Sequence, residues 1–341
     1  MPAIPPGSDE TPLTTILTDE EWAPLRRELI GYAYRMLGSP FDAEDAVQET
    51  MLRAWRARHR YDRRRSTPRT WVYAIAANVC RDMLRGRTRR SRAVDLAPPS
   101  QPGTELGIPL AADRWLEPFP ESLPADDADP ADITIAREGV QLAFMAVLQQ
   151  LPPYPRSVLI FRDVLGWRSN EVAVLLERTP SSVNSALQRA RAAIRAANPD
   201  LTDPLDPTSA GQRELLERYV EAFQRDDVDT LVSLLAYDAT MSMPPFTWWL
   251  SGRSAIEQLW RTASGVCDDS LLVPTVANGL AAFGHYVPSD GGGATARALQ
   301  VIETRRDRIV AMTSFLDTSR IFPLFGLPPE LVDTDLVATP R

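Results

Sequence analysis

A stretch of 44 residues, from 93 to 136, divides this chain more sharply than any other feature of its sequence. It holds eight prolines, and nine acidic residues against a single arginine, Arg114. Proline at this density removes backbone hydrogen-bond donors and prevents long helices, so the stretch is expected to be extended or irregular. A chain of 341 residues interrupted in this way is predicted to fold as two or three domains.

A second break, with three prolines, follows a helical pattern at 198–209. The two breaks predict the organisation of the whole chain. In order, it comprises a tail (1–20), a first module (21–92), the acidic linker (93–136), a second module (137–197), a short linker (198–210), a third domain (211–330) and a tail (331–341).

Charge is distributed in blocks that coincide with these parts. The net charge is -8 and the chain contains no lysine, so its 37 basic residues are all arginine. Residues 53–92 carry 14 arginines against two acids, a net charge of +12, and residues 137–197 carry +4. The linker 93–136 carries -8 and the residues from 198 onward carry -9. Two basic modules in an acidic protein indicate an anionic partner such as nucleic acid.

Several classes of protein are excluded or disfavoured. No apolar run approaches the length of a membrane span, and the first 20 residues lack the basic start and apolar core of a signal peptide, so a cytoplasmic location is expected. The two cysteines, Cys80 and Cys267, and the two histidines, His59 and His285, are far apart in the sequence. No metal site and no cofactor are therefore predicted.

Apolar spacing predicts three helices in the first module, at 22–37, 42–58 and 70–90. Gly38, Ser39 and Pro40 are expected to separate the first two. On the second helix, Val47, Met51, Ala54 and Trp55 form one face and the acids form the opposite face. The third is rich in arginine with interleaved aromatic residues, a composition suited to phosphates and unpaired bases. Trp71 fits core packing and base stacking about equally well.

The second module shows the pattern of a helix-turn-helix. Ser169 is expected to cap a helix that reaches Glu177, and Thr179 with Pro180 to begin a second helix that reaches about Ala197. The second helix exposes Ser, Asn, Gln and Arg side chains of the kind that read the major groove.

The third domain switches from helices to strands. Helices are predicted at 212–225 and 228–235, then strands at 240–243, 271–277, 281–287, 296–305 and 309–316, with a tight turn at Arg306–Asp307. The whole chain is thus predicted to be multidomain, with two all-α modules and an α+β domain whose helices cover one face of a curved sheet. Residues 290–293 (DGGG) lack the context of a nucleotide-binding loop, so a hairpin turn competes with anion binding there.

With these residues in view, the chain resembles the extracytoplasmic-function (ECF) sigma factors of the sigma-70 family. Residues 42–50 (DAEDAVQET) are similar to the segment of sigma region 2 that docks on the polymerase clamp helices, with Met51 where phenylalanine is usual. Residues 70–78 (TWVYAIAAN) are similar to the segment that recognises and melts the -10 element. Residues 138–196 are similar to region 4, which binds the -35 element and the polymerase flap.

The resemblance implies three sets of site residues. Core-polymerase binding is implied for Asp42, Glu44, Asp45, Gln48 and Glu49. Binding of -10 DNA is implied for Arg63, Arg64, Arg65, Arg69, Thr70, Trp71, Asn78, Arg81 and Arg85. Binding of -35 DNA is implied for Ser182, Asn184, Ser185, Gln188, Arg189 and Arg191.

Residues 211–330 resemble the SnoaL-like, NTF2-like cone domain that a subset of ECF factors carries at the C-terminus. The resemblance rests on residues 290–293, the late hairpin and residues 198–201 (NPDL). We expect this acidic domain to pack on the basic sigma modules through Asp290, Gly291, Gly292 and Gly293, modulating promoter recognition and replacing a separate anti-sigma protein. The competing hypothesis is a flexibly tethered domain. Whether it binds a small molecule is left open.

Two other functions remain open at this point. One is a cone-fold hydrolase or isomerase with a DNA-targeting appendage, which needs two or more titratable groups converging near His285. The other is a repressor-type helix-turn-helix regulator with a ligand-binding domain, which would bind duplex DNA without polymerase. The sigma-factor reading implies no catalytic residue.

Overall fold

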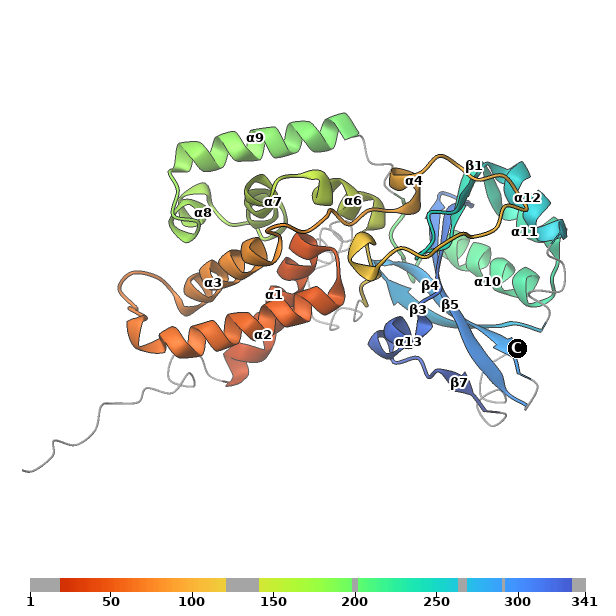
Figure 1. Ribbon diagram of the computed structural model, residues 1–341, viewed down its shortest axis with the longest axis horizontal. Coiled ribbons are helices and arrows are strands. Elements are labelled where there is room, and N and C mark those ends of the chain that lie inside the picture. The colour runs from red at the N-terminus through yellow and green to blue at the C-terminus, as the bar shows by residue number, and fades with distance from the viewer. Residues whose placement is uncertain (1–18, 121–140, 198–201, 263–268, 290–291, 333–341) are drawn as a thin grey trace, which may run out of the picture. The chain divides into compact units, whose positions relative to one another are not determined.

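The computed structural model describes residues 19–120, 141–197, 202–262, 269–289 and 292–332 (Figure 1). The chain forms two compact units. The first comprises residues up to Arg87 together with Leu148–Ala197, and the second comprises Thr88–Val147 together with the residues from Asn198 onward. The described part of the acidic linker therefore belongs to the same unit as the C-terminal domain. The predicted fold class, two all-α modules with an α+β domain, is confirmed.

The first unit is entirely helical. Its elements are α1 (Asp19–Leu37), α2 (Pro40–Ala57), a 3₁₀ turn (Arg58–Arg60), α3 (Pro68–Met83), α7 (Pro153–Leu159), a π-helical turn (Ile160–Val164), α8 (Ser169–Leu175) and α9 (Pro180–Ala197). α6 (Leu142–Gln150) crosses the boundary between the units. Gly38, at a φ of 75°, ends α1, and the Ser39 side chain accepts a hydrogen bond from Asp42 N to start α2.

Two details of these helices differ from the sequence prediction. α3 ends at Met83, not at Arg90, because the chain turns through Gly86 at a φ of 73°. Ser169 is the first residue of α8 and does not cap it, since its hydroxyl is bound to Asn184 in α9 and Arg168 occupies the cap position. The Thr179 cap of α9 is present, with Ser182 N 3.2 Å from Thr179 Oγ1.

An aromatic core joins the two helical modules into one unit. Tyr32 of α1 stacks on Phe161, with ring centroids 4.8 Å apart. Tyr73 of α3 lies edge-on to both Phe161 and Trp167, at 5.6 Å and 5.2 Å. The Tyr32 hydroxyl is 2.9 Å from Ser157 Oγ. These side chains are buried, so the first and second modules share one hydrophobic core.

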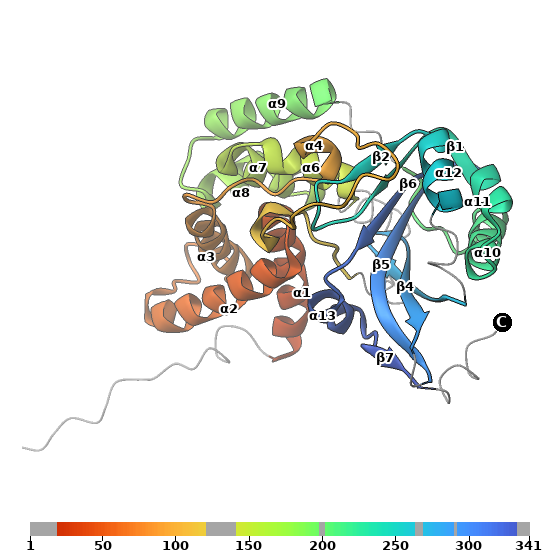
Figure 2. The same ribbon diagram turned by 45° about the vertical axis from the view of Figure 1, so that its right-hand side comes forward.

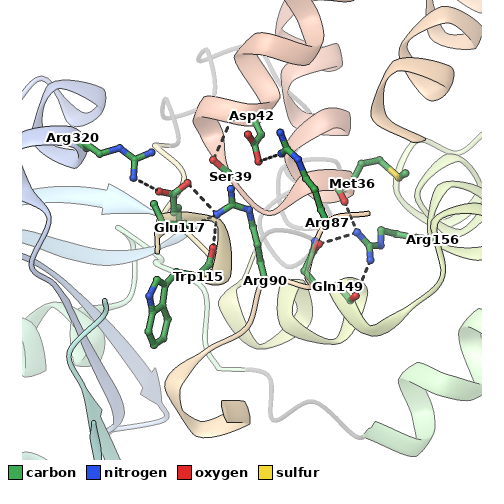
Figure 3. A network of polar contacts seen from close by, with 11 residues as sticks. Met36, Ser39, Asp42, Arg87, Arg90, Trp115, Glu117, Gln149, Arg156 and Arg320 are labelled. Atoms are coloured by element: carbon green, nitrogen blue, oxygen red, sulfur yellow. Dashed lines mark hydrogen bonds and ion pairs between the residues drawn. The ribbon is translucent and has the colours of Figure 1, made fainter. Parts of the chain in front are cut away.

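A buried arginine completes this junction (Figure 3). The Arg156 guanidinium, 3% exposed as a residue, donates to the backbone oxygens of Met36 in α1, Gln149 and Leu151. It also donates to Gln149 Oε1 at 2.8 Å, and the Gln149 amide in turn donates to Arg35 O at 3.2 Å. The backbone carbonyls of Arg35 and Met36 at the end of α1 therefore accept hydrogen bonds from side chains of α6 and α7. These bonds fix the position of the two modules relative to each other.

The second unit is built on a curved seven-stranded sheet (Figure 2). Its strands are β1 (Leu235–Ser242), β2 (Trp249–Ser251), β3 (Leu271–Ala277), β4 (Leu280–Pro288), β5 (Ala294–Arg305), β6 (Arg308–Phe315) and β7 (Glu330–Leu331). The order is β2-β1-β6-β5-β4-β3, with β7 beside β5. β1 and β6 are parallel and the other pairs are antiparallel.

Helices α10 (Ala210–Gln224), α11 (Val228–Leu234) and α12 (Arg253–Thr262) pack against the sheet. Their apolar faces meet the strands in one core cluster that includes Tyr219, Phe223, Leu231 and Ile256. The sequence analysis did not identify α12 or β2. The remaining short elements of this unit are α4 (Ala93–Leu96), a 3₁₀ turn (Ala112–Arg114), α13 (Thr318–Ile321) and a second 3₁₀ turn (Phe322–Phe325).

Candidate nucleic-acid interface

The helix-turn-helix is formed by α8 and α9. Val183, Ala186, Leu187 and Ala190 of α9 are buried, which leaves the rest of the helix surface to solvent. Ile194, predicted to belong to the buried face, is only partly buried. α9 is 18 residues long, about 27 Å at 1.5 Å per residue, which suits insertion into a major groove.

The six predicted -35 residues on α9 divide into two groups. Ser185, Gln188 and Arg189 are exposed, and no side-chain partner is found for them in the described part of the chain. The other three take part in internal hydrogen bonds: Ser182 with Tyr154 at 3.2 Å, Asn184 with Ser169 at 2.8 Å, and Arg191 with Asp163 at 2.7 Å and 2.9 Å. Only the first group can form new side-chain hydrogen bonds without breaking an internal one.

In the first module, the predicted -10 residues lie on α3 and on the loop before it. Arg63, Arg64 and Arg65 are exposed in that loop. Thr70 binds Thr67, the cap residue of α3. Trp71 is partly exposed and its ring lies 5.0 Å from that of Tyr61. This tilted aromatic pair is therefore a surface feature beside the arginine loop, not part of the aromatic core.

The remaining -10 residues already have partners within the helical unit. Arg69 binds Glu28 at 2.8 Å and 3.0 Å, and its guanidinium lies over the rings of Tyr73 and Trp167. Arg81 donates to Asn78, and Arg85 pairs with Asp82 at 3.3 Å. Arg69 thus helps to hold the modules together, a role that the sequence pattern did not indicate.

The acidic residues of α2 lie beside an exposed apolar strip. Asp42 pairs with Arg87 at 2.8 Å, Glu44 with Arg26, and Glu49 with Arg53 at 2.7 Å. Asp45 is exposed without an ion-pair partner in the described residues, and Gln48 lies 3.4 Å from Glu44. One and two turns further along, Leu52 is 40% and Trp55 is 49% exposed.

Trp55 was predicted to share one face of the helix with Val47, Met51 and Ala54, but Val47 and Ala54 are buried whereas Trp55 is exposed. Its ring lies instead under the Arg58 guanidinium, 4.5 Å from the centroid, on the solvent side of α2. We call the four residues Asp45, Gln48, Leu52 and Trp55 the α2 strip. An exposed strip with an apolar end is typical of a protein-docking surface.

The glycine run at the end of β4 is partly described. Asp290 and Gly291 lie outside the described residues. Gly292 and Gly293 have φ values of 87° and 78°, and Ser289 N is bound to Gly293 O at 3.2 Å, as in a hairpin turn. A Cβ on Gly293 would lie 2.2 Å from Leu331 O, so glycine is required there by the close approach of β7. The contact predicted between this run and the sigma modules stays a prediction.

His285 is buried inside the α+β domain. Its Nε2 is 3.1 Å from Ser270 Oγ, and its ring lies edge-on to Phe223 at 5.1 Å. Burial, with the charge of Arg297 as a smaller cause, lowers the pKa of His285 to about 4. The imidazole is therefore neutral at physiological pH.

Two negative findings apply to the described residues. No group of three or more His, Cys, Asp or Glu side chains there could hold a metal ion. Among the described helices, none combines the length and apolarity that crossing a bilayer requires.

Comparisons with known proteins assign a class to this arrangement. Residues 22–90 match the Sigma-70 region 2 family, residues 141–194 match Sigma-70 region 4, and residues 216–312 match the SnoaL-like domain. Two helical modules of these families followed by this domain define a sigma-70-type transcription factor.

Relatives that align with most of the chain identify the subfamily. The chain is 42% identical over 312 residues to the ECF RNA polymerase sigma factor SigG of Mycobacterium tuberculosis H37Rv, covering 90% of this chain and 83% of SigG. It is 31% identical over 65% of its length to SigJ of the same strain. The crystal structure of M. tuberculosis SigJ has a similar fold, with a TM-score of 0.60 over 91% of this chain and 99% of that one, at 23% identity. The chain belongs to the ECF RNA polymerase sigma factors, which confirms the resemblance.

The burial of His285 predicts a pH dependence of stability. Its folded pKa of about 4 lies below the unfolded value of 6.5, so the unfolded chain binds a proton that the folded domain does not. Stability should therefore fall, by up to about 3 kcal/mol, as the pH drops from 6.5 towards 4. The free energy of unfolding, measured with urea across this pH range, should fall less in His285→Gln than in the wild type. His59→Gln, at an exposed position, should behave as the wild type. Equal pH profiles for all three proteins would contradict the burial of a neutral imidazole.

Proposed function

We propose that this sigma factor brings core RNA polymerase to promoters through three separate binding surfaces. The α2 strip docks on the core enzyme at its clamp, the arginine loop with α3 captures the melted -10 strand, and α9 reads the -35 element. Because polymerase and promoter DNA are in the cytoplasm, the protein is proposed to act there. The observation that carries the proposal is the set of unpartnered, exposed side chains on the second helix of the helix-turn-helix.

Readout of the -35 element is supported by the chemistry of α9. Gln188 and Arg189 carry the amide and guanidinium groups that hydrogen-bond base edges, and Ser185 bonds either bases or phosphates. All three point to solvent from a helix whose opposite face is buried. Arg191 forms an ion pair with Asp163, and this pair would have to break before Arg191 could bind a DNA phosphate. It is therefore proposed as a positioning contact, not as a reader of sequence.

Capture of the -10 strand is supported by the neighbourhood of Trp71. The partly exposed Tyr61–Trp71 pair offers an aromatic face for an unstacked base. The three loop arginines before α3 supply positive charge for the phosphates on either side. Extruding a base costs a few kcal/mol, and stacking of about 1–3 kcal/mol per base can offset that cost.

Docking on polymerase is supported by the form of the α2 strip. Its apolar end offers area to bury, while the unpaired Asp45 carboxylate can pair with a basic group without first breaking an internal ion pair. Asp42, Glu44 and Glu49 are already paired, so they are proposed to shape the surface more than to bind directly.

The packed helical unit is proposed to be the resting state. Elements named -10 and -35 are about 25 base pairs apart, which is about 85 Å of B-DNA at 3.4 Å per pair. The two modules meet through ring contacts of about 5 Å in this structure, so they cannot occupy both elements without separating. Binding to core polymerase and promoter is proposed to supply the free energy of that opening.

The SnoaL-like domain is proposed to regulate, not to catalyse. Ser270 and His285 form the polar pair that most resembles a catalytic couple, but they are 1% and 6% exposed. Among the described residues, His285 has no carboxylate bonded to its ring, and a pKa of about 4 makes it a weak base near pH 7. The pair is more consistent with a satisfied core histidine.

Replacing Arg189 by Ala should weaken promoter binding by about 1–3 kcal/mol, because a bidentate base contact is lost. The loss should appear in run-off transcription with core polymerase on a promoter with an intact -35 element and shrink on one with a scrambled element. The matched control is Arg195→Ala, which removes an exposed arginine on the same helix. It should reduce transcription from both promoters equally or not at all. If Arg189→Ala were equally harmful on both promoters, α9 would not read the -35 sequence through this residue.

Reversing the unpaired charge of the α2 strip by Asp45→Arg should lower affinity for core polymerase at least tenfold, since like charges would then meet across the interface. Glu214→Arg makes the same change in net charge at an exposed site on α10 and should leave the affinity unchanged. Binding of labelled sigma to purified core enzyme measures both. Undiminished binding of Asp45→Arg, with an unchanged circular dichroism spectrum, would refute docking through this strip.

A further inference from the structure

The arginine loop before α3, residues 61–67, contains a turn that its own hydrogen bonds define. The turn begins at Asp62, whose backbone oxygen accepts a hydrogen bond from Arg65 N at 3.0 Å. The Asp62 carboxylate also accepts one from Arg64 N, at 2.9 Å from Oδ1. A carboxylate bonded to the backbone amide two residues further on forms an Asx turn, so the Asp62 side chain itself fixes the local backbone.

Tyr61 joins the two ends of this loop. Its hydroxyl donates to Ser66 O at 3.1 Å, and its ring lies 5.0 Å from the ring of Trp71 in α3. Thr67, the last residue of the loop, caps α3 by accepting a hydrogen bond from Thr70 N at 3.2 Å. Both the beginning and the end of the loop are therefore anchored to α3.

None of these bonds uses an arginine side chain. Arg64 and Arg65 contribute only their backbone amides to the turn, and both residues are exposed. No partner is found for their guanidinium groups in the described part of the chain. Two positive groups are thus presented to solvent by a backbone that is already ordered, which lowers the conformational entropy that binding a strand would cost.

The charge of Asp62 is unfavourable for binding an anion. Asp62 is one of two acids among residues 53–92, which carry 14 arginines, and it is exposed. Within the described residues it forms no ion pair, so its carboxylate does not serve to neutralise a neighbouring arginine. What the geometry shows for this carboxylate is its bond to the Arg64 amide.

We propose that Asp62, together with Tyr61, is a positioning residue for capture of the melted -10 strand. The Asx turn and the Tyr61 hydroxyl hold the loop in the conformation that presents Arg64 and Arg65 beside the Tyr61–Trp71 pair. Phosphates and an unstacked base can then be bound together. The inference rests on the proposed function, because it requires that the strand contacts this loop.

Two substitutions at one position separate the bond of Asp62 from its charge. Asp62→Asn and Asp62→Ala give the chain the same net charge, but only asparagine keeps a side-chain oxygen that can accept from Arg64 N. If charge alone mattered, both variants would bind the strand equally, and more tightly than the wild type. With positioning, Asp62→Asn should bind at least as tightly as the wild type. Asp62→Ala should bind about fivefold more weakly than Asp62→Asn, which is the effect of one hydrogen bond on the loop equilibrium.

The experiment measures binding of the holoenzyme, formed from core polymerase and full-length sigma variants, to a fluorescent single-stranded oligonucleotide. The oligonucleotide carries the non-template -10 sequence of a promoter mapped by run-off sequencing of host genomic DNA. Titrations at several salt concentrations give the salt slope of the affinity, which changes by about 0.7 for each phosphate contact to a single strand. Asp62→Ala should keep the slope of Asp62→Asn because its arginines are unchanged, whereas Arg64→Gln should lower the slope by about 0.7.

A second variant tests the other anchor of the loop. Tyr61→Phe keeps the ring beside Trp71 but removes the hydrogen bond to Ser66 O, so the strand should bind severalfold more weakly with an unchanged salt slope. Tyr237→Phe, at an 84% exposed site on β1, is the matched control. Trypsin reports on the loop itself, because cleavage after its arginines requires an opened backbone. In the free protein, cleavage at residues 63–65 should be about fivefold faster in Asp62→Ala than in Asp62→Asn.

Equal affinities of Asp62→Ala and Asp62→Asn for the strand would overturn the inference. Weaker binding by Asp62→Ala without faster cleavage of its loop would overturn it as well. If Asp62→Ala does not assemble with core polymerase, the comparison of Tyr61→Phe with Tyr237→Phe decides instead, and equal strand affinities of these two variants would count against positioning. An unchanged affinity and salt slope in Arg64→Gln combined with Arg65→Gln would show that the strand does not contact the loop, which would refute the proposed function of the loop.

Discussion

The contact between Tyr73 and the Phe161–Trp167 pair is the interaction on which the helical unit depends. Tyr73 comes from α3, the helix proposed to face the -10 strand, and its partners precede the helix-turn-helix. Arg69, one turn before Tyr73, lies over Trp167 and binds Glu28. The same short helix thus supplies proposed DNA contacts and the contacts that keep the two helical modules together. We propose that promoter binding and opening are coupled through it.

The described part of the acidic linker is bound to the SnoaL-like domain, where side chains of Trp248, Trp249 and Asn278 make hydrogen bonds with the linker backbone. The chain leaves this unit for region 4 and returns to it at one place, where Gln141 meets Thr202. The acidic domain is therefore more than an appended module, because the segments that flank region 4 are hydrogen-bonded to each other and to its sheet.

Much of the fold could be predicted because it depends on local signals. Gly38, the Thr179 cap and alternating apolar residues specify where helices and strands begin and end. Family-typical segments on α2, α3 and α9 likewise indicated the three proposed interfaces. Long-range pairing could not be predicted in this way. Nothing local in Arg90, Glu117 and Arg320 shows that these residues meet, and composition alone made the linker look like a free tether. Trp55 was misassigned because helical periodicity does not reveal which apolar residues are left for a partner.

The account's central claim is that the two DNA-reading modules are packed together at rest and separate on the promoter. Spin labels at His59 and Arg195, both exposed, report the distance between them by double electron–electron resonance, with Cys267 replaced by Ser and Cys80 left buried, where its pKa of about 12 limits labelling. The free protein should give one narrow distribution within about 40 Å, the diameter of a compact unit of this size. In the complex with core polymerase and promoter DNA, the distance should lengthen by tens of Å. The same short distance in both states, or a broad long distribution in the free protein, would contradict the claim.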